Sequence, residues 1–199
     1  MTSARPANAA AKLTNLLGRL QTHHPETYRH SQRVADLTLL LARQAQASDW
    51  PAETLRAAAL LHDIGKLEIP PALLNKVRSL TCDERLRFQR HTLDGAALLS
   101  PVPGLALAQS VARNHHERWD GSGYPNGLRG PAIPLAARIV CLADVYDALR
   151  ASRAYKSERT HREVLATMTQ THRQFDPHLL HLFLAAETMI HQFYDGASC

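Results

Sequence analysis

Cysteine is scarce in this sequence, and its three cysteines, Cys82, Cys141 and Cys199, are odd in number and widely spaced. This pattern argues against a disulfide framework or a cysteine-based zinc site and favours a reducing compartment. No apolar stretch approaches the roughly 18 residues of a membrane span. Residues 1–12 also lack the apolar segment of a signal peptide. We therefore expect a soluble, cytoplasmic protein that does not enter a membrane.

Dense runs of lysine and arginine are absent too, although the net charge is +5. Because basic residues are scattered and not interleaved with aromatic ones, we expect no nucleic-acid polymer as partner, and a small phosphorylated ligand fits as well. Histidine, in contrast, occurs 12 times, and it is the commonest ligand of transition metals. A chain of 199 residues with 45% hydrophobic residues has room for one domain with a core.

The apolar residues follow a helical period almost throughout. Val34, Leu37 and Leu41 predict an amphipathic helix over about 26–47, and residues 135–151, apolar on nearly every face, predict a buried central helix. Thr81 and Glu84 form a capping-box pattern. Further helices are expected over about 53–62, 81–100, 104–116, 160–171 and 177–193, and a loop with four of the nine glycines over 118–134. The sequence predicts a single all-α domain.

The adjacent pair His62-Asp63 is the most informative feature. It lies in the segment Leu-His-Asp-Ile-Gly-Lys-Leu-Glu-Ile, residues 61–69, directly after an apolar run. A buried imidazole and carboxylate are costly without a partner, so a metal ion would explain them. The alternative is that the pair caps a helix that ends near Gly65. A phosphate bound to such a metal would find Lys66 one helical turn away.

Other histidines and carboxylates have spacings that suit a shared ion. Glu26 and His30 lie four residues apart on one helix face, which also fits a surface pair. His115 and His116 are adjacent and point about 100° apart, which suits the end of a helix where the pair can bind two ions or two sides of one cluster. Asp144 lies inside the most apolar helix and needs a strong compensating partner. His91, taken alone, would be an ordinary helix histidine.

The order of His30, His62-Asp63 and Asp144 on a helical chain resembles the HD superfamily of metal-dependent phosphohydrolases. Residues 28–34, Tyr-Arg-His-Ser-Gln-Arg-Val, are similar to the family's entry motif, and residues 115–125 contain the Gly-Tyr-Pro of the HD-GYP subfamily. The resemblance covers roughly residues 26–183. It implies an HD-type bundle of about seven helices with a glycine-rich loop. Residues 1–25 would form an N-terminal helical extension and 26–199 the phosphohydrolase domain.

The resemblance implies a cyclic di-GMP phosphodiesterase that uses a metal-bridging hydroxide to form linear pGpG and, after a second cleavage, GMP. The implied metal ligands are Glu26, His30, His62, Asp63, His91, His115, His116 and Asp144. Eight protein ligands exceed what one octahedral ion can accept while it also binds water and substrate. Two ions bridged by Asp63 therefore fit better. A ligand set without thiolate suits iron, with manganese as the alternative. Glu26 is implied as the residue that favours a third ion.

The same resemblance implies roles on the substrate side. Lys66 would act beside Asp63 in catalysis by stabilising a phosphate or departing oxygen. The substrate-binding residues would be Gly123, Tyr124, Pro125, Asp147, Arg153 and Lys156. After Asp147 the chain departs from the family pattern, since Arg150, Ser152 and Ala154 replace Thr, Asp and Pro. These differences spare the metal ligands and bear on substrate affinity.

Two other functions are compatible with these residues. A generic HD phosphohydrolase acting on nucleotides would share the metal ligands, although it would not need the Gly-Tyr-Pro loop. A non-catalytic cyclic di-GMP receptor or interaction module would keep the fold, although relatives of that kind lose metal ligands. Diguanylate cyclases, or a regulatory protein acting in trans, are the expected protein partners.

Overall fold

The computed structural model describes residues 4–100, 102–151 and 159–196, and these form helices and loops without a strand, which confirms the all-α fold class. The α-helices are α1 (Ala4–His23), α2 (Pro25–Gln44), α3 (Ala52–Leu60), α4 (Pro71–Leu74), α5 (Cys82–Gln89), α6 (His91–Leu99), α7 (Ala106–Asn114), α8 (Leu135–Arg150), α9 (His161–Gln170), α10 (Pro177–Ala185) and α11 (Glu187–Gly196). Three short 3-10 helices complete the set, η1 (Ile64–Glu68), η2 (Gly130–Ala132) and η3 (His172–Gln174). None of the described helices has the length and apolarity needed to span a bilayer.

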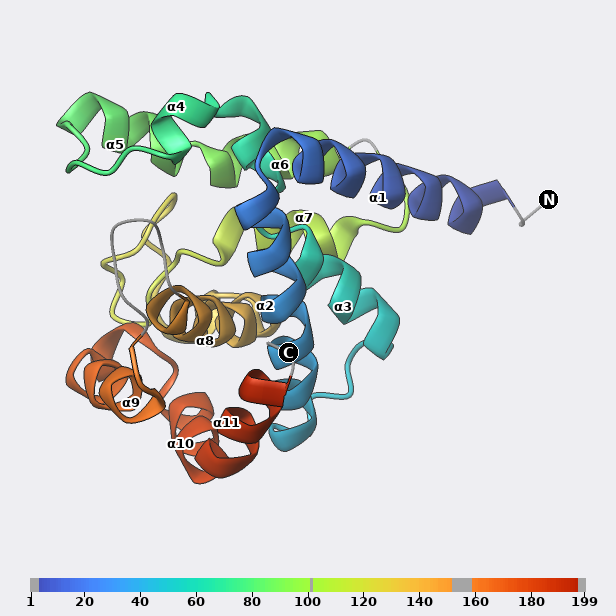
Figure 1. Cartoon of the computed structure of the whole chain (residues 1–199). Coiled ribbons are helices and arrows are strands. Elements are labelled where there is room, and N and C mark those ends of the chain that lie inside the picture. Colours follow the sequence, from blue (N-terminus) through green and yellow to red (C-terminus); the bar gives the residue numbers. More distant parts are fainter. Residues whose placement is uncertain (1–3, 101, 152–158, 197–199) are drawn as a thin grey trace.

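Helices α2 and α8 form the middle of the bundle (Figure 1). Helix α2 packs against α3 on one side and against α8 on another, while α9, α10 and α11 lie together at the opposite end from α4 and α5. Helix α8 is buried along most of its length, as expected for a helix that is apolar on nearly every face. Its two carboxylates, Asp144 and Asp147, are therefore held in the protein interior.

The start of α2 is set by local sequence. The side chain of His24 accepts the backbone N–H of Thr27, and Pro25 occupies the first turn, where its missing N–H costs nothing. Helix α1 precedes it and packs along α2 and η1 through the buried side chains of Leu16 and Leu20. His30 is thereby placed in the second turn of α2, on the side that faces α8.

Two of the expected helices are each divided in two. The segment expected as one helix over 81–100 forms α5 and α6, because His91 and Thr92 bond through their side chains to the carbonyls of Phe88 and Gln89. Those bonds compete with the helical hydrogen bonds that would continue α5. The capping box of Thr81 and Glu84 at the start of α5 is confirmed.

The second division falls within the helix expected over 177–193. It separates α10 from α11 at Ala186, and α11 then packs back against α2. This return buries Ile190 and Tyr194, so the C-terminal helix covers apolar surface of the central pair. The two divisions add two α-helices to the expected set, and α1 and the short α4 add the other two among the described residues.

Candidate metal centre

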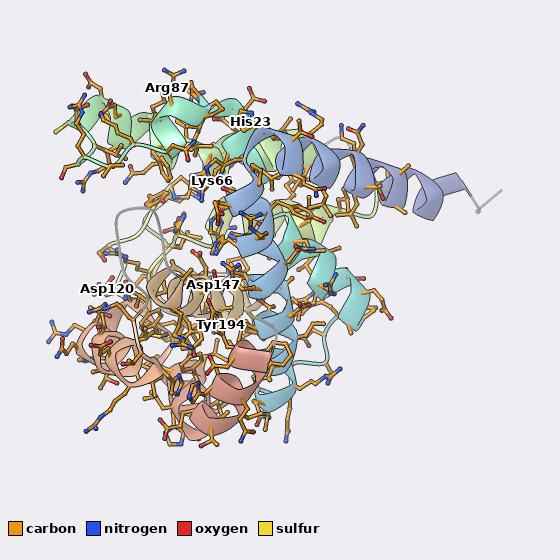
Figure 2. The ribbon with its side chains drawn as sticks, in the orientation of Figure 1. His23, Lys66, Arg87, Asp120, Asp147 and Tyr194 are labelled. Carbon is orange, nitrogen blue, oxygen red and sulfur yellow. The ribbon has the colours of Figure 1, made fainter. Side chains whose placement is uncertain are left out.

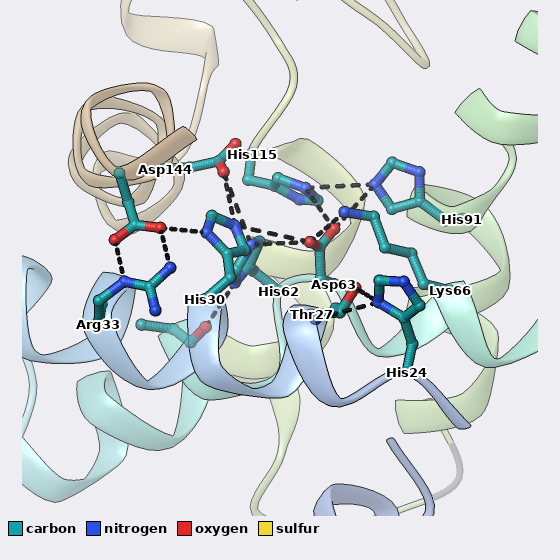
Figure 3. Close-up of polar contacts among 12 residues, drawn as sticks. His24, Thr27, His30, Arg33, His62, Asp63, Lys66, His91, His115 and Asp144 are labelled. Carbon is teal, nitrogen blue, oxygen red and sulfur yellow. Dashed lines mark hydrogen bonds and ion pairs between the residues drawn. The ribbon is translucent and has the colours of Figure 1, made fainter. Parts of the chain in front are cut away.

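Every predicted metal ligand except Glu26 falls into one of two neighbouring groups. Figure 3 labels all members of these groups except His116. The first group is Asp63, His91, His115 and His116, and the second is His30, His62 and Asp144. Within each group, one ligand atom from each residue lies within 4.8 Å of the others. The ligands come from α2, the turn after α3, the first residue of α6, the end of α7 and the middle of α8.

The Asp63 carboxylate lies between the two groups. Its Oδ1 is 3.4 Å from Nε2 of His91 and 3.7 Å from Nε2 of His115. Its Oδ2 is 3.3 Å from Nε2 of His62 and 3.8 Å from Nε2 of His30. Each oxygen thus faces one group, which is the geometry of a carboxylate that can serve two cations.

Backbone carbonyls orient three of the imidazole rings. Nδ1 of His62 donates to the carbonyl of Ala59 at 2.7 Å, Nδ1 of His91 to Phe88 at 2.7 Å, and Nδ1 of His115 to Ala112 at 3.0 Å. These bonds hold Nδ1 of each ring against a carbonyl, so the Nε2 atom is the one that faces Asp63 and can bind a metal ion. An imidazole lone pair and a carboxylate oxygen repel each other, so a cation between Nε2 and the Asp63 oxygen would stabilise this arrangement.

The helix-cap alternative for the His62-Asp63 pair holds only in part. His62 does satisfy a carbonyl in the last turn of α3 through Nδ1. Asp63 makes no capping hydrogen bond, and its Oδ1, like Nε2 of His62, is buried without a hydrogen-bond partner in the described structure. Buried polar atoms without partners are costly, so these two atoms point to an ion.

The charges of the two groups fit divalent cations. Burial lowers the pKa of His91 to about 3, and burial together with His115 holds that of His116 well below its ordinary value, so both rings are neutral. Although burial opposes ionisation, Lys66 and His62 hold the pKa of Asp63 well below its usual range, and His30 does the same for Asp144. His91 and His116 therefore offer neutral imidazoles beside two ionised carboxylates, which is a donor set that metal ions accept. Although burial opposes it, hydrogen bonds to Asp144 and Asp147 raise the pKa of His30 to about 9, so this ring must lose a proton before it binds a metal ion.

The His30 ring is oriented by a buried ion pair between Arg33 and Asp147, which the sequence did not predict. Nδ1 of His30 lies 2.7 Å from Oδ2 of Asp147, and Arg33 donates to both oxygens of the same carboxylate at 2.6 and 2.9 Å. Asp147 is fully buried, and Tyr194 of α11 lies beside it (Figure 2). Burial and the Asp147 charge raise the pKa of the Tyr194 hydroxyl. Asp147 was expected to contact substrate, whereas in this structure its oxygens face Arg33 and His30.

Replacing Asp147 by asparagine is expected to weaken the metal centre. The change leaves the partly buried guanidinium of Arg33 without its carboxylate, a loss of about 3 kcal/mol. The neutral amide is a weaker acceptor for Nδ1 of His30 than the carboxylate, and the loss of such a partner behind a ligating histidine lowers metal affinity by up to about 10- to 100-fold. Chelator competition and chemical denaturation measure the two effects.

Asp36→Asn is the matched control for this change. It breaks the more exposed Asp36–Arg56 pair, which lies on the surface and contributes about 1 kcal/mol or less. Equal metal affinity in the Asp147→Asn and Asp36→Asn proteins would contradict a positioning role for Asp147.

The glycine-rich loop is fastened against the first group of ligands. Glu117, which is buried, accepts the backbone N–H groups of Asn126 and Leu128 at 2.7 and 2.9 Å. A Cβ atom on Gly123 would lie 2.5 Å from the His116 carbonyl oxygen, so only glycine fits there. Tyr124 stacks on the His116 ring, with 4.8 Å between ring centroids, and a cis peptide bond joins it to Pro125. Reasoning from sequence missed Glu117, which reads as an ordinary charged loop residue.

The remaining predicted residues lie in different surroundings. The Glu26 side chain is exposed, pairs with Arg29 and belongs to neither ligand group. Nζ of Lys66 lies 2.5 Å from Oδ2 of Asp63 and above the Phe88 ring. Arg153 and Lys156 lie outside the described residues.

Comparison with known proteins places the fold and the ligands in one family. The HD domain family matches residues 16–179. The chain is 40% identical over 171 residues to a cyclic di-GMP phosphodiesterase of Pseudomonas aeruginosa, with 85% of this chain and 41% of the relative covered. It is 38% identical over 173 residues to a 3'3'-cGAMP-specific phosphodiesterase of Vibrio cholerae, with 85% of this chain and 33% of the relative covered.

The chain spans less than half the length of both relatives. Among solved structures, an HDG"Y"P protein from Bdellovibrio bacteriovorus has the same fold, with a TM-score of 0.66 and 21% identity, over 85% of this chain and 52% of that one. Sequence, fold and ligand groups agree. The chain belongs to the HD domain family and, with its Gly-Tyr-Pro loop, to the HD-GYP branch.

Proposed function

We propose that this chain is a metal-dependent phosphodiesterase that hydrolyses cyclic di-GMP to the linear dinucleotide pGpG. The observation that carries the proposal is the position of the Asp63 carboxylate between two groups of buried nitrogen and oxygen ligands. Relatives at about 40% identity that are named as cyclic dinucleotide phosphodiesterases support it. Residues 26–199 are the proposed catalytic domain, with residues 1–25 as an N-terminal extension.

The proposed cofactor is a pair of iron ions, with manganese as the alternative, because both groups contain only imidazole and carboxylate ligands. Burial raises the pKa of the Cys141 thiol to about 12, so this buried cysteine offers no thiolate. When bound, such ions lower the pKa of water and offset the charge on phosphoryl oxygens. Glu26 stays a prediction as the ligand of a third ion.

The residues around the centre support phosphate chemistry. The Lys66 ammonium group lies beside Asp63 and within 5.5 Å of the centroid of the Phe88 ring, so its position is restrained on two sides. From there it can donate to a phosphate oxygen, where a fixed positive charge stabilises the transition state. Tyr124 covers His116 and offers an aromatic face on which a guanine base can stack.

Replacing Lys66 by methionine is expected to lower turnover by about 100- to 1000-fold, the effect of removing one donor aimed at developing charge. Bound metal is expected to stay the same or increase, because Asp63 loses a competing cation. Lys76→Met is the matched control, since Lys76 pairs with Glu84 away from the centre. Initial rates and metal content are measured together, and a Lys66→Met rate within twofold of the native rate contradicts the role.

The substrate is tested with two cyclic dinucleotides. Protein loaded with iron or manganese under anaerobic conditions is incubated separately with cyclic di-GMP and with 3'3'-cGAMP, and the products are separated by chromatography. We expect cyclic di-GMP to be converted to pGpG, with GMP appearing only if a second cleavage follows. Cleavage of 3'3'-cGAMP alone would show that the substrate assignment is wrong. Binding of cyclic di-GMP without cleavage by the metal-loaded protein would favour the receptor alternative.

A further inference from the structure

A pocket lies between the glycine-rich loop and the start of α10. It has a volume of about 640 Å³, within the range of small-molecule sites, and none of the predicted metal ligands lines it. One wall comes from the loop, through Trp119 and Arg129, and the other from η3 and α10, through Arg173, Phe175 and Leu180. Asp120, at the edge of this pocket, lies beside the C-terminal helices (Figure 2).

The floor of the pocket is apolar and rigid. Phe175 and Leu180 are only 2% and 6% exposed, and Leu184 continues the same surface. The Trp119 ring packs against the guanidinium of Arg138, with 5.6 Å between them. Arg138 is itself fixed by Asp176 at 2.6 Å, so the indole is held in place before any ligand arrives. A flat apolar body would contact this floor without rearrangement.

The edge of the pocket is positively charged. Arg129 and Arg173 are exposed, and neither guanidinium group makes a hydrogen bond or close ion pair within the part of the chain that the structure describes. Asp120 is the single carboxylate among the lining residues, and Ser122 already occupies it through its N–H at 2.9 Å and its hydroxyl at 2.6 Å. Two exposed guanidinium groups and a single carboxylate leave a net positive charge above an apolar floor, which favours an anion with an apolar body.

We propose that this pocket binds a small aromatic anion, with its ring on Trp119 and Phe175 and its acidic group between Arg129 and Arg173. The site is independent of the proposed phosphodiesterase activity, because it shares no residue with the metal centre. The pocket is nevertheless connected to the metal centre through the glycine-rich loop. The backbone N–H of Trp119 donates to the backbone carbonyl of Gln174 at 2.9 Å, and Trp119 follows the predicted ligand His116 by three residues.

Anilinonaphthalene sulfonate is the probe that tests this proposal, since it has a flat apolar body and one anionic group. We expect saturable binding to the native protein, followed by the fluorescence of Trp119 in a Trp50→Phe background. The double variant Arg129→Ala/Arg173→Ala is expected to raise the dissociation constant about tenfold or more. The uncharged parent, anilinonaphthalene, is expected to bind native protein with a dissociation constant that is also about tenfold higher than that of the anionic probe.

Two further variants keep the test decisive. Arg43→Ala/Arg78→Ala removes the same charge from exposed positions outside the pocket, and its affinity for the probe should match that of native protein. Leu184→Trp fills the pocket and should also weaken binding. Absence of saturable binding, equal weakening by both arginine pairs, or unchanged affinity in Leu184→Trp would each overturn the proposal. The last result would place the probe elsewhere, for example at Leu86, which is 63% exposed.

Discussion

Replacing Asp63 by alanine is expected to remove bound metal and to lower phosphodiester turnover by at least about a thousandfold, on the scale of losing a principal catalytic group. The reason is geometric, because Asp63 is the residue whose two oxygens face different ligand groups. Without Asp63, the site between the two groups of imidazoles has lost a carboxylate whose negative charge would offset the charge of two cations. Metal analysis of protein loaded with excess iron or manganese, together with initial rates, measures the effect.

Two variants separate this effect from unfolding. Asp63→Asn keeps the shape of the side chain and removes its charge, so it should lose metal while keeping the helical content seen by circular dichroism. Asp94→Ala removes a carboxylate from the outer side of α6, where it lies 3.7 Å from Arg90, and should leave the metal content unchanged. An Asp63→Ala protein that holds as many ions as native protein would show that no bridging carboxylate is required.

The Gly65→Ala protein is expected to be less stable by about 3 kcal/mol or more, a large effect for one methyl group. A Cβ atom at this position would lie 1.9 Å from the carbonyl oxygen of His91 and 2.5 Å from the backbone nitrogen of Gly95. Both are backbone atoms of α6, so no side chain can turn away to make room. Helix α6 would have to move, and it would carry His91 away from Asp63.

Gly18→Ala is the matched control, because nothing lies within 4 Å of its added Cβ atom. Gly18 is exposed in the interior of α1, where alanine should stabilise the protein by about 0.5–1 kcal/mol. Chemical denaturation gives both free energies, and metal analysis reports the displacement of His91. Native-like stability of Gly65→Ala would contradict the close approach of η1 and α6.

Much of the fold could be predicted from local patterns. Helical spacing predicted α2, α3 and α7 to within a few residues, and the apolar faces of α8 predicted its burial. The division between α5 and α6 could not be predicted in this way. It depends on side-chain bonds of His91 and Thr92 to carbonyls that an isolated helix would use itself.

The sequence identified most residues of the candidate site, but it did not predict which of them contact one another. His62, Asp63 and Asp144 stood out because charged or metal-binding side chains are costly in apolar segments. Arg33 and Glu117 did not stand out, since a single charged residue on a helix or loop is usually solvated. Their functions follow from partners distant in sequence, Asp147 for Arg33 and the backbone of Leu128 for Glu117.

The sequence by itself determined the helical class and the set of candidate ligands, because helical period and the cost of burying polar groups act over a few neighbouring residues. A bridging role for Asp63 was already expected from the sequence, but only the tertiary structure showed which histidines face each of its oxygens and that Glu26 belongs to neither ligand group. Those positions depend on how closely η1, α6 and α7 approach one another. That approach is set by contacts such as Gly65 against His91, which join residues distant in the chain.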